Sequence, residues 1–269
     1  MKYKNTKFLI GSFIIIILFL CMIFGLFLMP YNPNEVDIAH KMQFFSSAHI
    51  LGTDSLGRDV FCRIVISLRI SFIMGVVAAT SACAIGTFFG SIGGYFGGIT
   101  DSVVTKIIDI QMAFPGILLA LMISAVFGAG FGNTLLALSI MSVPRFARIA
   151  RSGFIRYRNS PLVLAEKARG ASAVRIMYVH ILPHISGDLV VTYALSFAFA
   201  IMNESGLSYL GLGIQPPDAS FGKMLHDAQS CIFTAPWLII TPAVVLAFLS
   251  AGFMLISDGI TAKKEESRV

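Results

Sequence analysis

The sequence predicts an all-α polytopic membrane protein with six transmembrane helices. Of its 269 residues, 56% are hydrophobic and only 13% are charged, which is unlike the composition of a soluble domain of this size. Uncharged runs recur along the chain, and each is long enough to cross a hydrocarbon core of about 30 Å as a helix. Lysine and arginine gather on alternate connections between these runs, as the positive-inside rule describes.

The first span is expected over residues 8–29, "FLIGSFIIIILFLCMIFGLFLM", which carry no charge. Lys2, Lys4 and Lys7 precede this run, as in a secretory signal peptide. The run is longer than the apolar region of a signal peptide, and no small-residue cleavage site follows it. We therefore expect residues 1–69 to form a retained transmembrane helix followed by an extracytoplasmic segment.

The second, third and fourth spans follow from the positions of charges. No charge lies between Arg69 and Asp101, which predicts a span at 70–97. The 35 uncharged residues between Asp109 and Arg145 would make a helix of about 53 Å, so they must cross twice. The sequence "GAGFGN" at 128–133 supplies the turn and places spans at 106–127 and 134–150.

Two further apolar runs predict the remaining spans, at 189–212 and 237–257. Six crossings put both termini on one side, and the segments on that side hold 15 of the 20 lysines and arginines. The positive-inside rule therefore predicts cytoplasmic termini. We expect a transmembrane domain over 70–258, a cytoplasmic loop at 151–184 and a cytoplasmic tail at 259–269.

The cytoplasmic loop is strongly basic and has its own helical pattern. Residues 145–175 carry eight cations against Glu166 alone, which could serve as a topology signal or attract anionic lipid. Ser160 and Pro161 are typical of a helix start, and Gly170 is typical of its left-handed end. Ser172 can then cap a second short helix.

The second short helix is expected to present an apolar stripe and to stop at Pro183. The stripe follows a spacing of three and four residues and consists of Val174, Met177, Tyr178 and Ile181. Two short amphipathic helices that meet at a glycine suggest a docking element for a cytoplasmic partner. An interfacial helix that lies on lipid would have the same periodicity.

This loop carries a family resemblance. The segment "LVLAEKARGASAVRIMYVHILP" (162–183) resembles the cytoplasmic EAA loop of permease subunits of ATP-binding-cassette (ABC) importers, with matches at Gly170, Ile181, Leu182 and Pro183. Three further segments are similar to the C-type subunit of the peptide and nickel permease subfamily: "LGTDSLGRDVFCRI" (51–64), "DIQMAFPGILLAL" (109–121) and "NESGLSYLGLGIQPPDASFGKML" (203–225). The likeness covers about residues 50–258.

The resemblance implies a type I ABC importer permease fold in the cell (cytoplasmic) membrane. This subunit would form a heterodimer with a homologous B-type permease, above two ABC ATPase subunits and below an extracytoplasmic substrate-binding protein. The loop would be the coupling helix, and its coupling residues would be Leu164, Ala165, Glu166, Ala168, Gly170, Arg175, Ile181, Leu182 and Pro183. ATP and Mg²⁺ would be bound by the ATPases. The resemblance thus implies a non-catalytic subunit that binds no cofactor itself. In agreement, the chain has no GxxxxGK[ST] sequence with which to hold a phosphate as a P-loop does.

The loop departs from the family pattern at its acidic residue. Aligned on Gly170, the family's glutamate falls at Leu164, and its two alanines fall at Ala165 and Glu166. The acid has moved by two positions, or about 200° around a helix. We therefore expect the contact with the ATPase to be made differently. Phe221 also stands where the family commonly has tryptophan.

The second span has a small residue at every fourth position, which predicts a ridge for close helix packing. The partner could be another helix of this chain or the second permease. The residues are Ala78, Ala82, Gly86, Gly90, Gly94 and Gly98.

Three residues within the spans are candidates for the translocation path or its gate. Pro115 and Pro144 should kink or hinge their helices, which suits a gate but is also frequent in membrane helices. Glu204 is the one acid within an apolar span, and we place it towards the outer boundary. It could face the path, hold its helix to the "GLGIQPP" turn, or be a purely structural carboxyl.

The remaining polar residues suggest structural roles. Asp109 is expected to pair with Lys106 or a loop arginine. Cys62 and Cys231 fall on the same side of the membrane and could pair, but the cysteine and histidine spacings predict no metal site. Mutual ion pairs are expected at the outer surface among Asp54, Arg58, Asp59 and Arg63.

The sequence thus favours a permease subunit that forms half of the translocation path for peptides. The same role for nickel or a metal chelate is an alternative. A stand-alone secondary transporter is an alternative of another class, but it would typically show inverted repeats and buried ionisable residues. A membrane enzyme would need a nucleophile with a base, an HExxH sequence or an intramembrane aspartate pair, and the sequence supplies none of these.

Overall fold

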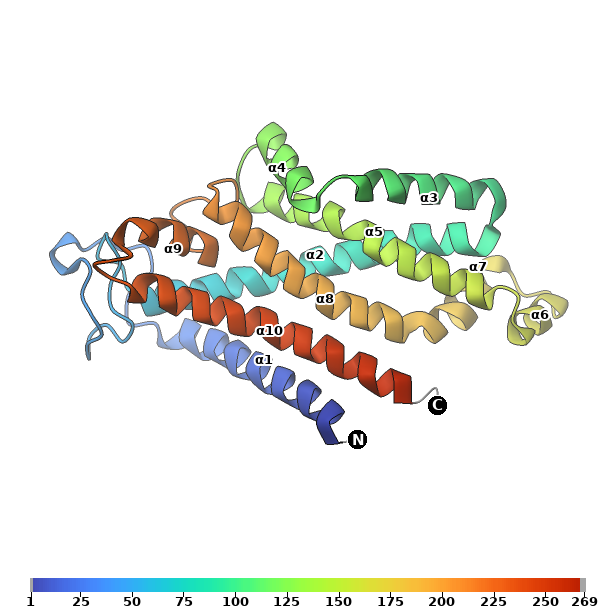
Figure 1. Cartoon of the computed structure of the whole chain (residues 1–269), viewed down its shortest axis with the longest axis horizontal. Helices are drawn as coiled ribbons and strands as arrows, with labels where there is room; N and C mark the ends of the chain where they lie inside the picture. Colours follow the sequence, from blue (N-terminus) through green and yellow to red (C-terminus); the bar gives the residue numbers. More distant parts are fainter. Residues whose placement is uncertain (1, 267–269) are drawn as a thin grey trace.

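The computed structural model describes residues 2–266, which form a bundle of long helices with a loop-rich region at one end (Figure 1). Apart from an isolated bridge between Thr53 and Asp59, the described residues contain no β-structure. The elements are α1 (Lys2–Leu28), η1 (Ile38–His40), α2 (Val60–Phe96), α3 (Gly98–Ala113), α4 (Gly116–Phe127), α5 (Phe131–Tyr157), α6 (Pro161–Ala168), α7 (Ala173–Arg175), η2 (Ile176–Ile181), α8 (Leu182–Tyr209), α9 (Phe221–Ala228), η3 (Gln229–Cys231) and α10 (Trp237–Glu266).

Within the described residues, four helical stretches are long and apolar enough to cross a membrane: Thr6–Leu28, Val60–Phe96, Ala173–Tyr209 and Trp237–Lys264. A fifth span results if α3 and α4 are counted together. Helix α5 falls short of this apolarity because it carries several arginines, three of them between residues 145 and 151. It nevertheless lies inside the bundle, packed against α2 and α8.

The predicted third span, 106–127, is wrong as a single helix. Helices α3 and α4 are bent by 85° at Phe114 and Pro115. The ring of a proline disfavours the helical conformation of the residue before it, and Phe114 is accordingly extended, with φ −89° and ψ 132°. Pro115 therefore breaks the helix where the sequence predicted a kink.

Other helices extend beyond their predicted spans. Helix α2 begins at Val60, ahead of the predicted residue 70, and Asp59 caps it by accepting a 2.8 Å hydrogen bond from the Cys62 amide. Helix α10 runs to Glu266, so most of the predicted tail at 259–269 is helical. The end of that tail, residues 267–269 with Arg268, lies outside the described residues.

The glycine ridge of α2 packs against α5 of the same chain. A Cβ on Gly86 would lie 2.6 Å from the Val143 carbonyl oxygen, and one on Gly94 would lie 2.6 Å from that of Arg151. A Cβ on Gly90 would overlap the Ala147 carbonyl. The prediction is wrong for Gly98, which starts α3 with φ +57° and where an added Cβ would have no neighbour within 4 Å.

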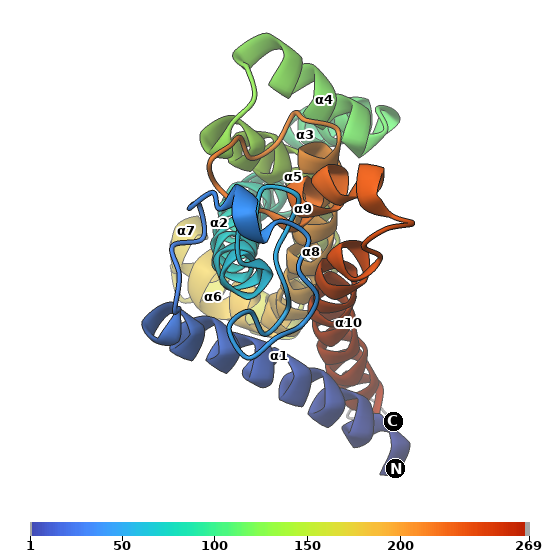
Figure 2. The same cartoon turned by 90° about the vertical axis from the view of Figure 1, so that its left-hand side faces the viewer.

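Helices α1 and α10 pair at the edge of the bundle (Figures 1 and 2). A Cβ on Gly11 would lie 2.6 Å from the Gly252 carbonyl oxygen, so the two backbones approach closely. The start of α1 and the end of α10 lie towards the end of the bundle that carries α6, whereas η1 and α9 lie at the opposite end (Figure 1). We call these the α6 end and the α9 end.

Candidate functional site

The turn between α6 and α7 is built by local capping, as the sequence predicts. The Ser160 hydroxyl accepts a 3.4 Å hydrogen bond from the Val163 amide, and the Ser172 hydroxyl accepts one of 3.4 Å from the Arg175 amide. Gly170 has φ +79°, and its amide donates to the Lys167 carbonyl at 3.0 Å. The next amide, of Ala171, donates to the Glu166 carbonyl at 3.0 Å, which completes a Schellman motif.

The prediction that Pro183 stops the second helix is wrong. Residues Ala173–Tyr209 form one continuous helix, and Pro183 lies in the first turn of α8. The turn before it, η2, is π-helical, and the Leu182 amide donates to the Met177 carbonyl five residues back. A proline has no amide proton and clashes with a regular helix, so the wider π turn lets the chain continue through it.

The π turn also changes which side chains are buried. Met177 and Ile181, which the sequence predicts on the presented stripe, are buried together with Ile176, whereas Val174 is 66% exposed and Tyr178 is 37% exposed. The predicted presented stripe is therefore wrong for Met177 and Ile181, which pack into the core, and agrees with the exposure of Val174 and Tyr178. The exposed apolar residues of α6, α7 and η2, which we call the α6–α7 surface, are Leu162, Leu164, Val174, Tyr178 and Val179.

The displaced acid of the loop points inwards. The Glu166 side chain is 16% exposed, and its carboxylate lies 3.3 Å from an Arg169 nitrogen and 3.7 Å from His180 Nε2. Leu164, at the position of the family's glutamate, is 52% exposed. Ala165, Ala168, Gly170, Arg175 and Pro183 are also exposed, while Leu182 is half-buried.

The two proline gate candidates line one cavity. It has a volume of about 390 Å³ and lies where α3, α4, α5 and α8 meet, at the break at Pro115. Pro144 lies in α5, which continues through this proline and also lines the cavity. Sequence reasoning missed the polar residues of this cavity, Gln111, Ser142, Arg145 and Asn203. Arg145 falls inside the predicted span 134–150, and a charged residue within a span could have indicated a polar cavity there.

Glu204 lies outside this cavity and is fully buried. Its carboxylate accepts a 2.7 Å hydrogen bond from the Ser208 hydroxyl, which in turn accepts one of 2.9 Å from the Ile214 amide. Ile214 belongs to the "GLGIQPP" turn. Of the three predicted roles, the geometry matches the one in which Glu204 holds α8 to this turn.

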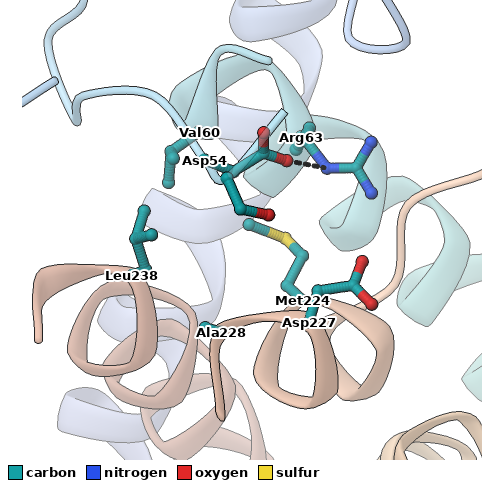
Figure 3. A pocket seen from close by; sticks show the side chains of 8 residues that line it. Asp54, Val60, Arg63, Met224, Asp227, Ala228 and Leu238 are labelled. Atoms are coloured by element: carbon teal, nitrogen blue, oxygen red, sulfur yellow. Dashed lines mark ion pairs between the residues drawn. The ribbon is translucent and has the colours of Figure 1, made fainter. Parts of the chain in front are cut away.

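A buried ion cluster joins the start of α2 to α9, and Figure 3 shows its members Asp54, Arg63 and Asp227. Arg58 Nε lies 2.7 Å from Asp54 Oδ2, and Arg63 Nε lies 3.8 Å from the same oxygen. Arg58 also lies 3.6 Å from Asp227 of α9, a partner that the sequence did not predict. A cavity of about 20 Å³, the size of a water molecule, lies between Asp54, Arg63 and Asp227.

Asp59 takes no part in this cluster, because it caps α2 and lies 2.9 Å from His49 Nδ1. The thiols of Cys62 and Cys231 are both buried and free. The described residues include no group of three or more histidines, cysteines or acids that could hold a metal ion.

Two ion pairs join α3 to α5. Asp101 forms a bidentate pair with Arg151, with Nη2 at 2.7 Å from Oδ2 and Nε bonded to the other oxygen. Asp109 lies 3.6 Å from Arg148, which is one of the predicted loop arginines. These contacts fix α3 alongside α5 up to the break at Pro115.

Comparison with known proteins places this architecture in a family. The family model described as the binding-protein-dependent transport system inner membrane component matches residues 86–263. The model for the N-terminal transmembrane domain of oligopeptide transport permease C matches residues 3–46.

Individual relatives match almost the whole chain. The dipeptide transport system permease protein DppC of Alkalihalophilus pseudofirmus is 38% identical over 96% of this chain and 84% of its own length. The oligopeptide transport system permease protein OppC of Bacillus subtilis is 34% identical over 97% and 86%. The glutathione transport system permease protein GsiD of Pectobacterium atrosepticum is 36% identical over 93% and 83%.

A solved structure shares the fold. A chain of the inward-facing MetNI methionine ABC transporter superimposes with a TM-score of 0.61 and 18% identity, covering 75% of this chain and 95% of that chain. The family model spans well over half of the 269 residues, and the relatives exceed 30% identity over nearly the full length. The chain belongs to the family of binding-protein-dependent transport system inner membrane components.

Proposed function

We propose that this chain is the C-type permease subunit of an ATP-driven peptide importer in the cytoplasmic membrane. It would cross the membrane six times, with α5 and the α3–α4 pair among the crossings. The α6 end, with the start of α1 and the end of α10, would be cytoplasmic, and the α9 end would face outwards. The relatives named for dipeptide, oligopeptide and glutathione transport favour peptides over nickel as cargo.

The observation that carries this proposal is the α6–α7 surface. It combines exposed apolar side chains with cations at the end of two helices whose mutual angle is fixed by the Schellman turn at Gly170. A rigid protrusion with exposed apolar side chains is suited to bind in a groove on a partner protein. The partner would be an ABC ATPase, which would hold ATP and Mg²⁺, because no P-loop sequence is present in this chain.

The packing suggests how motion at this surface reaches the cavity. Helix α7 continues through η2 into α8, and Val163 of α6 belongs to the same core cluster as Phe146 and Phe154 of α5. A push on α6 by closure of the ATPases would therefore move α5 and α8 together. Both helices line the cavity at Pro115, so the push would change its access and drive alternating access.

The test is reconstitution of the chain with the ATPases, second permease and binding protein encoded beside it. We expect one complex that takes up labelled dipeptide only when ATP is supplied and the ATPases are intact. Recovery of the chain alone, with uptake that survives inactivation of the ATPases, would contradict the proposal.

A further inference from the structure

Three arginines follow one another along α5 at a spacing of three residues, which keeps each on the same side of the helix as the next. Arg151 is bound to Asp101, and Arg148 lies 3.6 Å from Asp109. Each of these two arginines therefore has a carboxylate partner on α3. The third, Arg145, lies one turn nearer to the break at Pro115.

Among the described residues, no carboxylate lies within ion-pairing distance of Arg145. The reason is the path of the chain, because α3 ends at Ala113 and the chain then turns by 85° into α4. No acid follows Asp109 in the sequence until Glu166. The Arg145 guanidinium instead lies over the ring of Phe199, with Cζ 4.4 Å from the ring centroid.

The cavity that Arg145 lines has complementary polar groups. Gln111 donates its side-chain nitrogen to the Ile140 carbonyl, and Asn203 donates its nitrogen to the Phe199 carbonyl at 2.7 Å. Their amide oxygens are therefore the groups left to accept hydrogen bonds. The cavity thus offers one cation and two neutral acceptors, and no acidic residue lines it.

We propose that Arg145 is the anion-binding residue of the translocation cavity and receives the carboxylate of the passing cargo. This inference rests on the proposed function and adds a recognition group to it. A guanidinium held against an aromatic ring can bind a carboxylate through two parallel hydrogen bonds. The oxygens of Gln111 and Asn203 would accept N–H groups of the same peptide, so the cavity suits a chain with a free carboxyl end.

A lipid phosphate could supply the same anion chemistry, and the experiment separates the two sources. The assembled complex is reconstituted with its four native cysteines in this chain changed to serine and with Met112→Cys as a reporter in the cavity. Its reaction rate is measured with a negatively charged and a positively charged thiosulfonate reagent. Arg145→Gln should lower the ratio of the first rate to the second by about tenfold, because it removes a nearby positive charge.

Arg148→Gln is the matched control. Arg148 lies outside the cavity lining and already faces Asp109, so this change should leave the rate ratio within about twofold. An equal ratio for the Arg145→Gln and unsubstituted complexes would overturn the proposal. This readout requires no transport, so it is independent of whether the cargo is a peptide.

A second experiment measures ATP-driven uptake and separates the cargo carboxylate from the lipid phosphate. In vesicles of neutral lipid, Arg145→Gln should lower ATP-driven uptake of a dipeptide with a free carboxylate at least about tenfold, and Arg145→Lys should retain part of it. Stimulation of ATP hydrolysis by the loaded binding protein should persist in both. If the loss occurs only in vesicles that contain anionic lipid, the anion is a lipid headgroup and the cargo assignment is wrong. If the unsubstituted complex takes up no peptide, the proposed function fails instead.

Discussion

Gln111 of α3 donates a hydrogen bond from its side-chain nitrogen to the carbonyl oxygen of Ile140 in α5. This carbonyl lies four residues before Pro144, which has no amide proton to give it. The side chain of one helix thus replaces the hydrogen bond that proline removes from the other. The interaction explains how α5 continues through Pro144 inside a membrane bundle.

Gln111→Leu should therefore destabilise the chain by about 1–3 kcal/mol, because it leaves the Ile140 carbonyl without a donor. In a Pro144→Ala background, the alanine amide can donate to Ile140 instead, and the cost of Gln111→Leu should fall below about 1 kcal/mol. Unfolding by SDS in mixed micelles measures both free energies. Equal costs in the two backgrounds would show that Gln111 and Pro144 are not coupled.

Gly90→Ala should destabilise the packing of α2 on α5 by about 1–3 kcal/mol, because the added methyl group would overlap the Ala147 carbonyl. Gly132→Ala is the control, since nothing lies within 4 Å of its Cβ position and the residue is helical. It should be neutral or slightly stabilising. The comparison uses the same SDS titration, and similar losses in both variants would argue against the glycine ridge.

Asp54→Asn should cost about 3 kcal/mol or more, because it leaves the buried guanidinium of Arg63 without its nearest carboxylate. The same substitution at Asp258 tests an exposed pair, since Asp258 and Lys7 are each 57% exposed. Asp258→Asn should cost less than about 1 kcal/mol. Thermal unfolding in detergent ranks the two variants, and the reverse order would contradict the role given to the buried cluster.

Gly170→Val should uncouple ATP hydrolysis from uptake, because valine disfavours the φ of +79° on which the turn between α6 and α7 depends. Gly170→Asn is the matched variant, since asparagine tolerates the left-handed conformation and should retain most of the coupling. The ratio of peptide taken up to ATP hydrolysed in proteoliposomes measures the effect. Full coupling in the valine variant would exclude a mechanical role for this turn.

Local chemistry made much of the α6–α7 turn predictable. Ser160, Gly170 and Ser172 act on their own immediate neighbours, so capping rules place them correctly. The same rules wrongly predicted a helix end at Pro183. The π turn that accommodates this proline is held by tertiary packing of Ile176 and Ile181. Sequence spacing alone does not report that packing.

Contacts between distant segments explain the other differences. Asp227 joins Arg58 from far along the sequence, and Gln111 meets Ile140 only because α3 lies along α5. The glycine ridge could be predicted from the sequence because a small residue recurs at every fourth position of one helix. Its partner, α5, became identifiable only when the fold brought Val143, Ala147 and Arg151 against it.

The central claim is that the α6–α7 surface is where an ATPase subunit docks, and a cross-linking measurement tests it most directly. In the assembled complex, Leu164→Cys carrying a short photo-cross-linker should attach to the ATPase, since Leu164 is 52% exposed on this surface. Phe233→Cys, at a position that is 97% exposed and lies just after α9 and η3, should attach to the binding protein and not to the ATPase. Cross-linking of the ATPase through residue 233 and not through residue 164 would contradict the account.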